Sequence, residues 1–229
     1  RHPLALPGRG TPQGVAAIER SDLVRWHRRL FVPARSVVAV AGDVEPARAI
    51  AAIARALGGW RGRDPGAPVL PALERLGGGR EDYLPMDREQ VHIYLGHLGV
   101  DRNHPDFYAL LVLDHVLGTG SGFTDRISRK LRDEQGLAYS VSAGITSSAH
   151  KLPGYFAAYI GTSPANRAAA LAGFLEEIRR IRERAPSRAE VQQVHDYLTG
   201  SFYLSLERSA RVARFLVNLE RFRLGLDYL

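Results

Sequence analysis

Two side chains that lie seven residues apart, Arg132 and Tyr139, could together bind a polarised oxygen atom. Arg132 falls near the predicted C-terminus of a charged helix, where a cation interacts favourably with the helix dipole. Tyr139 follows the predicted helix end and is expected early on the next strand. A guanidinium and a phenol are both donors suited to a peptide carbonyl or a developing oxyanion. A purely structural alternative is a helix-cap arginine beside a half-buried strand tyrosine.

The histidines do not predict a zinc site. A helical metal pair needs two ligands three or four residues apart on one face, and no two of the eight histidines have that spacing. His92 and His97 lie five apart on a predicted strand, so we expect them on opposite faces. The sequence contains no HExxH, no HxxEH and no cysteine, so thiolate zinc sites and disulfides are excluded. We expect this chain to bind no metal itself.

Other chemical patterns have structural explanations. The glycine-rich run at 118–122 follows a predicted helix rather than a strand, so it predicts a flexible helix–helix turn and not a phosphate cradle. Asp114 and His115 have no G-x-S-x-G motif to complete a triad, and adjacent helical residues point about 100° apart. The acid pairs at 133–134 and 176–177 lie on charged helices and are expected to face solvent.

The elements that would position these residues fall into two blocks. The first block, residues 1–62, predicts two helices around one strand. Ser21 is the expected N-cap of the first helix. The β-branched run Ser36–Ala41 predicts a short buried strand. The second helix is predicted over Ala47–Leu57, with Pro46 as its first residue.

Residues 63–79 are rich in proline and glycine and form the predicted linker to the second block, residues 80–229. The elements predicted in that block are a strand at Gln90–Leu95, helices at Asp106–Leu117 and Phe123–Gln135, paired strands at Leu137–Ser148 and Gly154–Gly161, and helices from Ser163 to Arg184, from Ser187 to Leu206 and on to Gly225. Gly136 is expected to end the charged helix, and Ser187 with Glu190 forms a capping box.

This order of elements predicts the fold class. Strands mixed with helix pairs, rather than regular strand–helix alternation, predict an α+β fold with antiparallel or mixed sheets and helices packed on one face. The second block has no strand that corresponds to the strand predicted in the first block. If the two blocks are copies of one repeat, we therefore expect the start of the first copy and the end of the second copy to be missing. Because the chain begins at Arg1 and not at Met, we also expect a segment that precedes it.

The net charge of +7 raises the question of nucleic acid. The cations are nearly all arginines, which alternate with acids along the predicted helices, and this is typical of solvated helix faces. We therefore expect no nucleic-acid partner, although a basic nucleic-acid-binding module stays open as an alternative. No apolar stretch approaches the roughly 20 residues of a membrane span. The sequence does not distinguish a cytoplasmic from a periplasmic location.

The segment around Arg132 and Tyr139 resembles the C-terminal half of the insulinase/pitrilysin family of zinc peptidases. In that family a Leu-Arg helix end runs into Gly-Leu-x-Tyr-Ser, which matches Leu131-Arg132 and Gly136–Ser140 here. The first block resembles the back half of the family's N-terminal domain. The further matching motifs are Arg1-His2-Pro3, Gly10-Thr11, Leu23-x-x-Trp26-His27, Pro33, Val38–Val44, Leu113–Gly118 and Gly122-Phe123-Thr-x-Arg126.

The resemblance implies truncated metallopeptidase-half domains, like those of LuxS and the mitochondrial processing peptidase. It implies a parent protein that cleaves peptides by attack of zinc-bound water, with the zinc ligands preceding Arg1. Arg132 and Tyr139 would be substrate-binding residues that hold the substrate backbone. The implied cofactor is zinc in the parent or in a partner, and the implied partners are a peptide or protein substrate and a zinc-bearing homologous subunit or homodimer.

Two functions follow from this resemblance. The chain is a fragment of a zinc-dependent metalloendopeptidase, or it is a metal-free partner or scaffold subunit of such an enzyme. In both cases the chain alone is predicted to be inactive, because no catalytic group that activates water is recognised in it.

Overall fold

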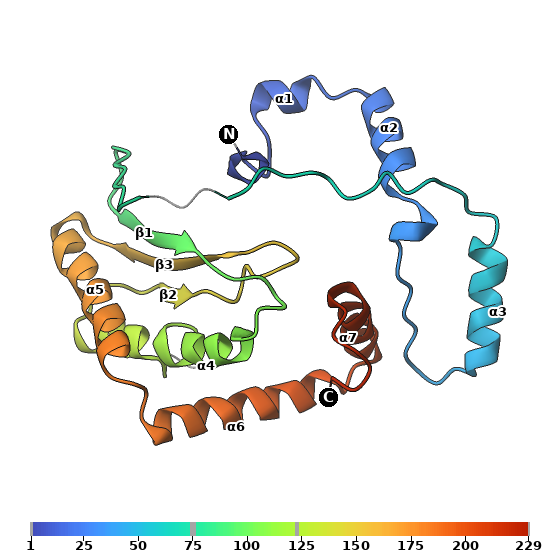
Figure 1. Cartoon of the computed structure of the whole chain (residues 1–229). Coiled ribbons are helices and arrows are strands. Elements are labelled where there is room, and N and C mark those ends of the chain that lie inside the picture. Colours follow the sequence, from blue (N-terminus) through green and yellow to red (C-terminus); the bar gives the residue numbers. More distant parts are fainter. Residues whose placement is uncertain (1, 74–76, 122–123, 229) are drawn as a thin grey trace. The chain divides into compact units, whose positions relative to one another are not determined.

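The computed structural model of the 229-residue chain describes residues 2–73, 77–121 and 124–228. Its residues form two compact units (Figure 1). Unit 1 consists of Arg1–Gly79 with Ser209–Gly225, and unit 2 consists of Arg80–Arg208 with Leu226–Leu229. The division into domains 1–62 and 80–229 with a linker at 63–79 stays a prediction.

Some predicted features lie outside the described residues. They are Arg1 of the first motif, residues 74–76 of the linker, Gly122 at the end of the glycine-rich run and Phe123 at the predicted helix start.

Unit 1 is helical in its described residues. Its elements are η1 (Pro3–Ala5), α1 (Pro12–Ala16), α2 (Arg20–Leu30), η2 (Pro33–Arg35), α3 (Pro46–Leu57) and α7 (Ser209–Phe222). The prediction that Pro46 opens a helix ending at Leu57 is confirmed. The predicted N-cap Ser21 is wrong: Glu19 is the N-cap, because its backbone N–H donates to the Asp22 carboxylate over 3.0 Å.

The predicted strand at Ser36–Ala41 does not form. Its valines Val37, Val38 and Val40 are 45%, 54% and 46% exposed. A strand needs a neighbouring strand to pair its backbone N–H and C=O groups. Every strand among the described residues belongs to unit 2, so the β-branched run has no partner to pair with.

Unit 2 contains a three-stranded antiparallel sheet in the order β1-β3-β2. Its elements are β1 (Val91–Leu98), α4 (Phe107–Leu117), η4 (Ser128–Glu134), β2 (Val141–Gly144), β3 (Tyr155–Thr162), η5 (Pro164–Asn166), α5 (Arg167–Glu183) and α6 (Arg188–Ser205). The sheet and the helices against its one face confirm the predicted α+β class with an antiparallel sheet. Figure 1 shows α4 running beneath the strands.

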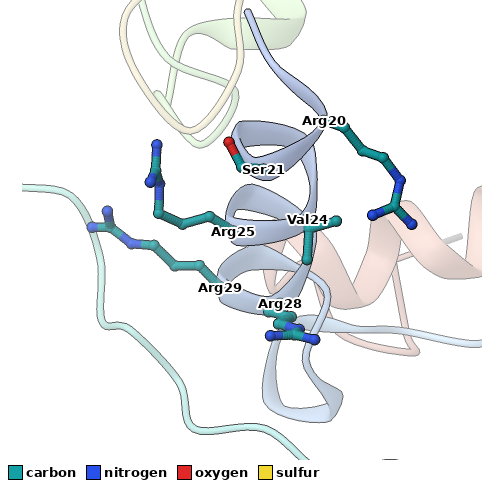
Figure 2. Close-up of a pocket in the computed structure, with 6 residues that line it drawn as sticks. All are labelled: Arg20, Ser21, Val24, Arg25, Arg28 and Arg29. Atoms are coloured by element: carbon teal, nitrogen blue, oxygen red, sulfur yellow. The ribbon is translucent and has the colours of Figure 1, made fainter.

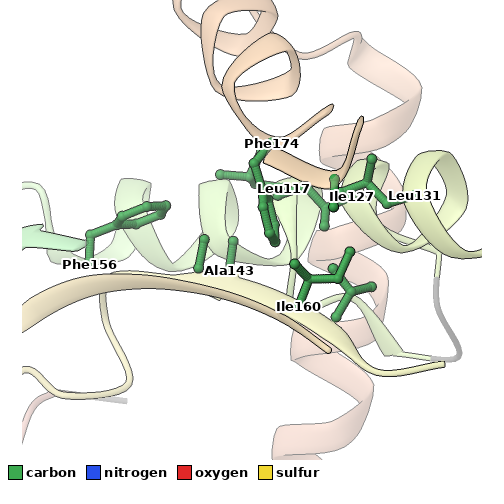
Figure 3. Close-up of a cluster of buried hydrophobic side chains, with 10 residues drawn as sticks. Leu117, Ile127, Leu131, Ala143, Phe156, Ile160 and Phe174 are labelled. Atoms are coloured by element: carbon green, nitrogen blue, oxygen red, sulfur yellow. The ribbon is translucent and has the colours of Figure 1, made fainter. Parts of the chain in front are cut away.

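The hydrophobic core of unit 2 lies between the sheet and the helices. Phe174 of α5, Ile127, Leu131 of η4 and Ile160 of β3 are each 0% exposed. Figure 3 shows these side chains converging above β3. Burying one such side chain stabilises the fold by roughly 1.5–3 kcal/mol. Side chains alternate between the two faces of β3, and Ala158 and Ile160 lie on the face that points toward the core.

β2 is shorter than the predicted strand Leu137–Ser148 because neighbouring groups take its backbone donors. The Leu137 N–H donates to Leu131 O at the end of η4 over 2.8 Å. At the other end, the Ile145 and Thr146 N–H groups each donate to the Asp114 carboxylate over 2.8 Å. Asp114 of α4 is only 3% exposed. Because its carboxylate accepts these two N–H groups, they are not available to pair with another strand, and β2 ends before them.

The expectation that the acid pair 176–177 faces solvent is wrong for Glu177, which is 3% exposed. Glu177 lies three residues after Phe174 and seven after Ala170, which are both buried, so helical periodicity turns it toward the same face. The Arg180 guanidinium donates to the Glu177 carboxylate over 2.9 Å, which compensates the buried charge.

The glycine-rich run after α4 is closely packed where it is described, and not a flexible turn. A Cβ on Gly118 would lie 2.5 Å from the Ala143 nitrogen and 2.8 Å from its oxygen. A Cβ on Gly120 would lie 2.8 Å from the Asp125 nitrogen. The Ala143 N–H also donates to Gly118 O over 3.1 Å, so α4 docks on β2 by direct backbone contact.

Gly118→Ala is therefore expected to destabilise unit 2 by about 2 kcal/mol or more, because the methyl group meets backbone atoms that cannot rotate away. Gly200 is the matched control: it is exposed within α6, and a methyl group added there would have nothing within 4 Å. Gly200→Ala is expected to stabilise the helix by about 0.5–1 kcal/mol. Hydrogen exchange of β3 amides measures both effects, and equal protection in the two variants would contradict this account.

Candidate functional site

Arg132 and Tyr139 lie together in the structure. The Arg132 guanidinium carbon lies 5.2 Å from the centroid of the Tyr139 ring, within cation–π range. The Arg132 side chain is 22% exposed and its Nε lies 3.9 Å from an Asp133 carboxylate oxygen. Tyr139 is 86% exposed. The pair thus presents one partly buried cation and one accessible phenol on the surface of unit 2.

The turn between the two residues has a defined helix-ending geometry. Gly136 has φ +62°, the left-handed conformation in which glycine meets no steric penalty. The Gly136 N–H donates to Arg132 O over 3.1 Å, and the Leu137 N–H donates to Leu131 O over 2.8 Å. These two bonds resemble a Schellman motif in which each bond spans one residue more, in keeping with the wider turn of the π-helix that they end. The predicted role of Gly136 as the residue that ends the helix is confirmed.

The segment that carries Tyr139 is also tied to β3. The hydroxyl of Thr162, which is 3% exposed, donates to Leu137 O over 2.6 Å. The Gly161 N–H donates to Ser140 O over 3.3 Å. Backbone bonds on both sides of Tyr139 therefore hold the phenol near Arg132.

Two details of the predicted site are corrected. Tyr139 is not on the strand but in a bend two residues before β2, because its neighbours bond to η4 and to the end of β3. The helix that carries Arg132 is a π-helix at Ser128–Glu134, shorter than the charged helix predicted over Phe123–Gln135. The exposure of Tyr139 also contradicts the structural alternative of a half-buried strand tyrosine.

An ion pair fixes the helical segment just before η4. Arg126 Nε lies 2.7 Å from one Glu190 carboxylate oxygen, and Arg126 Nη2 lies 3.0 Å from the other. Glu190 also accepts from the backbone and hydroxyl of Ser187, each over 2.8 Å, which confirms the predicted capping box. The Arg126 hydrogen bonds, with those of Ser187, lower the pKa of Glu190 to about 2.

Glu190→Gln is expected to destabilise unit 2 by about 1–2 kcal/mol at neutral pH, because a bidentate ionic contact is lost. The pKa of Glu190 is lower in the folded state than its ordinary value of 4.5, so the stabilisation is present above about pH 4.5 and is lost as pH falls toward 2. The wild-type advantage in denaturant titrations should shrink across that window. The exposed Glu81→Gln is the control, and a pH-independent difference would refute the assignment.

The described residues hold no metal-ligand cluster. In the described ranges, no three His, Cys, Asp or Glu side chains are grouped so that they could hold a metal ion. His92 contacts Tyr159, and His97 stacks on the buried Phe156, so the two histidines lie on opposite faces as predicted. The side chains described here therefore do not fit a zinc site. Within the same ranges, no helix is long and apolar enough to cross a membrane.

Unit 1 carries an arginine cluster on α2 around a shallow cavity of about 550 Å³. Figure 2 shows Arg25 and Arg29 extending to one side of the helix and Arg20 to the other. Asp22 pairs with Arg25. The cations thus point in different directions rather than along one phosphate track, and the expected lack of a nucleic-acid partner stays a prediction.

Unit 2 is an α+β domain of the metallopeptidase-half type, with an antiparallel sheet backed by helices. The peptidase M16 inactive domain matches residues 17–198 of the chain, so the chain belongs to the peptidase M16 family.

The sequence relatives have zinc-protease and non-peptidase names. An uncharacterized zinc protease of Mycobacterium leprae is 31% identical over 99% of this chain and 51% of its own length. A non-peptidase homolog of Helicobacter pylori is 26% identical over 87% of this chain and 45% of its own length. The chain spans about half the length of the curated relatives it matches.

A solved structure has the same fold. The crystal structure of a peptidase M16 inactive domain from Pseudomonas fluorescens superposes with a TM-score of 0.81 and 23% identity. The match covers 97% of this chain and 52% of that chain. At this identity the likeness establishes the fold alone.

Sequence reasoning missed the side chains that hold the site in place. The sequence pattern pairs Asp114 only with His115, without the G-x-S-x-G motif of a triad, and gives Glu190 only a capping role. It does not indicate that the Thr162 hydroxyl anchors the Tyr139 segment. The alternation of side chains along β3 indicates that Thr162 is buried. The acceptor of its hydroxyl, Leu137 O, lies 25 residues away in the sequence, so this hydrogen bond forms only in the folded chain.

Proposed function

We propose that this chain supplies the substrate-backbone-binding part of an M16 zinc metalloendopeptidase. In this proposal Arg132 and Tyr139 are the substrate-binding residues, and the ligand is a peptide or protein. Zinc is held by residues outside this sequence, either in the parent protein or in a partner subunit. No residue of this chain is assigned a catalytic role in activating water.

The observation that carries the proposal is the exposure of Tyr139. Its side chain is 86% exposed, yet its ring lies against the Arg132 guanidinium and its backbone neighbours are anchored. Among the described residues, the Tyr139 hydroxyl makes no hydrogen bond, so it is available to a ligand. An accessible donor held in one place is what binding a peptide carbonyl requires.

The two side chains would act on the carbonyl in different ways. The Tyr139 hydroxyl would donate a directional hydrogen bond to the carbonyl oxygen. The Arg132 guanidinium would add a positive charge beside the same oxygen. Donors aimed at an oxygen that becomes negatively charged lower the barrier to attack on the carbonyl carbon.

Zinc can be supplied in two arrangements. In the first, the zinc ligands belong to the same parent polypeptide. The names of the relatives and the chain's coverage of about half their length support it. In the second, the chain is a metal-free subunit that acts in trans on a zinc-bearing homologous subunit or in a homodimer. The non-peptidase name of one relative supports this arrangement.

Unit 1 offers a surface for either arrangement. The apolar stripe of α2 is exposed, with Leu23 at 62% and Trp26 at 55%, and Ile50 of α3 is 67% exposed. Apolar side chains gathered on one helix face mark sites of contact with further protein. This supports a role for unit 1 in holding the chain to its zinc-bearing counterpart.

The test is peptide cleavage by the zinc-bearing parent, or by a mixture of this chain with a zinc-bearing homologue, with Tyr139→Phe as the variant. Sedimentation of the mixture separates the two arrangements, because only the in trans arrangement requires a complex. The in trans arrangement fails if the chain stays monodisperse and never binds such a homologue. Zinc-dependent cleavage by this chain alone would overturn the assignment of the zinc ligands elsewhere.

A further inference from the structure

Unit 2 contains a charged cavity that is distinct from the Arg132–Tyr139 pair. It has a volume of about 700 Å³ and lies between η4, α5 and the N-terminal end of α6. Neither Arg132 nor Tyr139 lines it. Small-molecule sites commonly have volumes of about 300–1,000 Å³, so this cavity has the size of a ligand site.

The lining of the cavity carries more positive than negative charge. Its cations are Arg126, Arg129, Lys130, Arg179, Arg180 and Arg184, and its carboxylates are Glu134, Glu177, Glu183 and Glu190. Six cations against four carboxylates leave an excess of two positive charges. A cavity whose walls carry one net sign attracts ligands of the opposite sign.

Each carboxylate in the lining is already bound by a cation of the same lining. The four ion pairs are Arg126 with Glu190 at 2.7 Å, Lys130 with Glu134 at 2.8 Å, Arg180 with Glu177 at 2.9 Å, and Arg179 with Glu183. In the part of the chain that the structure describes, Arg129 and Arg184 have no carboxylate within ion-pair distance. These two guanidiniums account for the excess charge.

The excess positive charge persists across the neutral pH range. Arginine and lysine stay protonated there. The Lys130 hydrogen bond lowers the pKa of Glu134, and the Arg126 hydrogen bonds lower the pKa of Glu190, so both carboxylates stay ionised and paired. The acids therefore hold their cations in place, and Glu134 also interacts with Arg129 at longer range.

We propose that this cavity binds a phosphate-bearing polyanion, with Arg129 and Arg184 as its principal ligands. Guanidinium groups bind phosphate oxygens through two parallel hydrogen bonds, and a phosphate chain carries more negative charge than a single carboxylate. The remaining pairs form a preorganised wall, since Arg126 is fixed by Glu190 and the start of α6. The volume of about 700 Å³ favours a short phosphate chain over an extended polymer such as RNA.

Calorimetric titration of the full chain with inorganic tripolyphosphate at low salt tests the proposal. The expected result is saturable binding at one site. Arg129→Gln and Arg184→Gln are each expected to weaken binding on the order of tenfold. Arg182→Gln is the matched control, because Arg182 is an exposed cation of α5 that does not line the cavity, and it should leave the affinity within about twofold.

A variant that is expected to bind tripolyphosphate more tightly distinguishes a lost ligand contact from a misfolded protein. Glu183→Gln removes one of the two carboxylates that bind Arg179, the other being Glu176 outside the lining, so it is expected to tighten tripolyphosphate binding several-fold. Binding that is absent at low salt, or unchanged in the Arg129→Gln/Arg184→Gln double variant, overturns the proposal. So does a glutamate-rich peptide that binds as tightly as tripolyphosphate. The titration does not depend on proteolysis, so its outcome is independent of the proposed function.

Discussion

Tyr139→Phe is expected to lower kcat for peptide cleavage by the zinc-bearing parent or complex about 100-fold, with a much smaller change in KM. The substitution removes only the hydroxyl of a side chain that is 86% exposed, so the fold should not change. Removal of one donor that stabilises a developing oxyanion typically costs a factor of about 100–1,000 in kcat. Steady-state kinetics on a fluorogenic peptide measure the effect.

The matching changes at Arg132 test whether the two donors act together. Arg132→Lys keeps the charge but loses the planar group that lies over the Tyr139 ring, so kcat should fall at least about tenfold. Because the residues are in contact, the double variant should lose less than the product of the single losses. Tyr203→Phe, at an exposed tyrosine of α6, is the control. Cleavage by Tyr139→Phe at the wild-type rate would remove the assignment.

Asp114→Ala is expected to destabilise unit 2 by roughly 3–5 kcal/mol, the largest stability effect we foresee in this chain. The carboxylate is 3% exposed and accepts three hydrogen bonds. Its donors are the Ile145 N–H at 2.8 Å, the Thr146 N–H at 2.8 Å and the Thr146 hydroxyl at 2.6 Å. Truncation leaves these donors without an acceptor in a buried setting, which costs more than the bonds themselves contribute.

The consequence of Asp114→Ala should appear as faster hydrogen exchange in β2 and β3. Tryptophan fluorescence is unsuitable, because Trp26 and Trp60 both belong to unit 1. Asp106→Ala is the matched control: its side chain is 71% exposed and makes no capping bond, so the change should stay within about 0.5 kcal/mol. Equal exchange rates in the two variants would show that Asp114 does not hold the end of β2.

The sequence predicted the local features whose signals are short in range. The helix end at Gly136 and the capping box of Ser187 and Glu190 depend only on residues within a few positions, and both are confirmed. The period of apolar residues predicted the helices and strands of unit 2, and hence the α+β class. The resemblance around Leu131–Ser140 predicted the family, which the match to residues 17–198 establishes.

The strand predictions are wrong where hydrogen bonds to groups outside the segment decide whether its backbone can pair with another strand. β2 is four residues long rather than twelve because Asp114 and Leu131 accept bonds from its flanks. The run Ser36–Ala41 has ordinary strand composition but no strand beside it to pair with. In both cases the local sequence favours extended backbone, and only long-range pairing decides whether a strand forms.

For the candidate site, the sequence determined which two residues could bind an oxygen atom together, and the tertiary structure decided how they are presented. The types and spacing of Arg132 and Tyr139 predicted a donor pair. The exposure of the phenol, its contact with the guanidinium and its anchoring by Thr162 depend on the packing of η4 beside β2 and on the bond from β3 to Leu137. The reason is physical: a residue's chemistry is carried by its own atoms, but its accessibility and its neighbours are set by segments far along the chain.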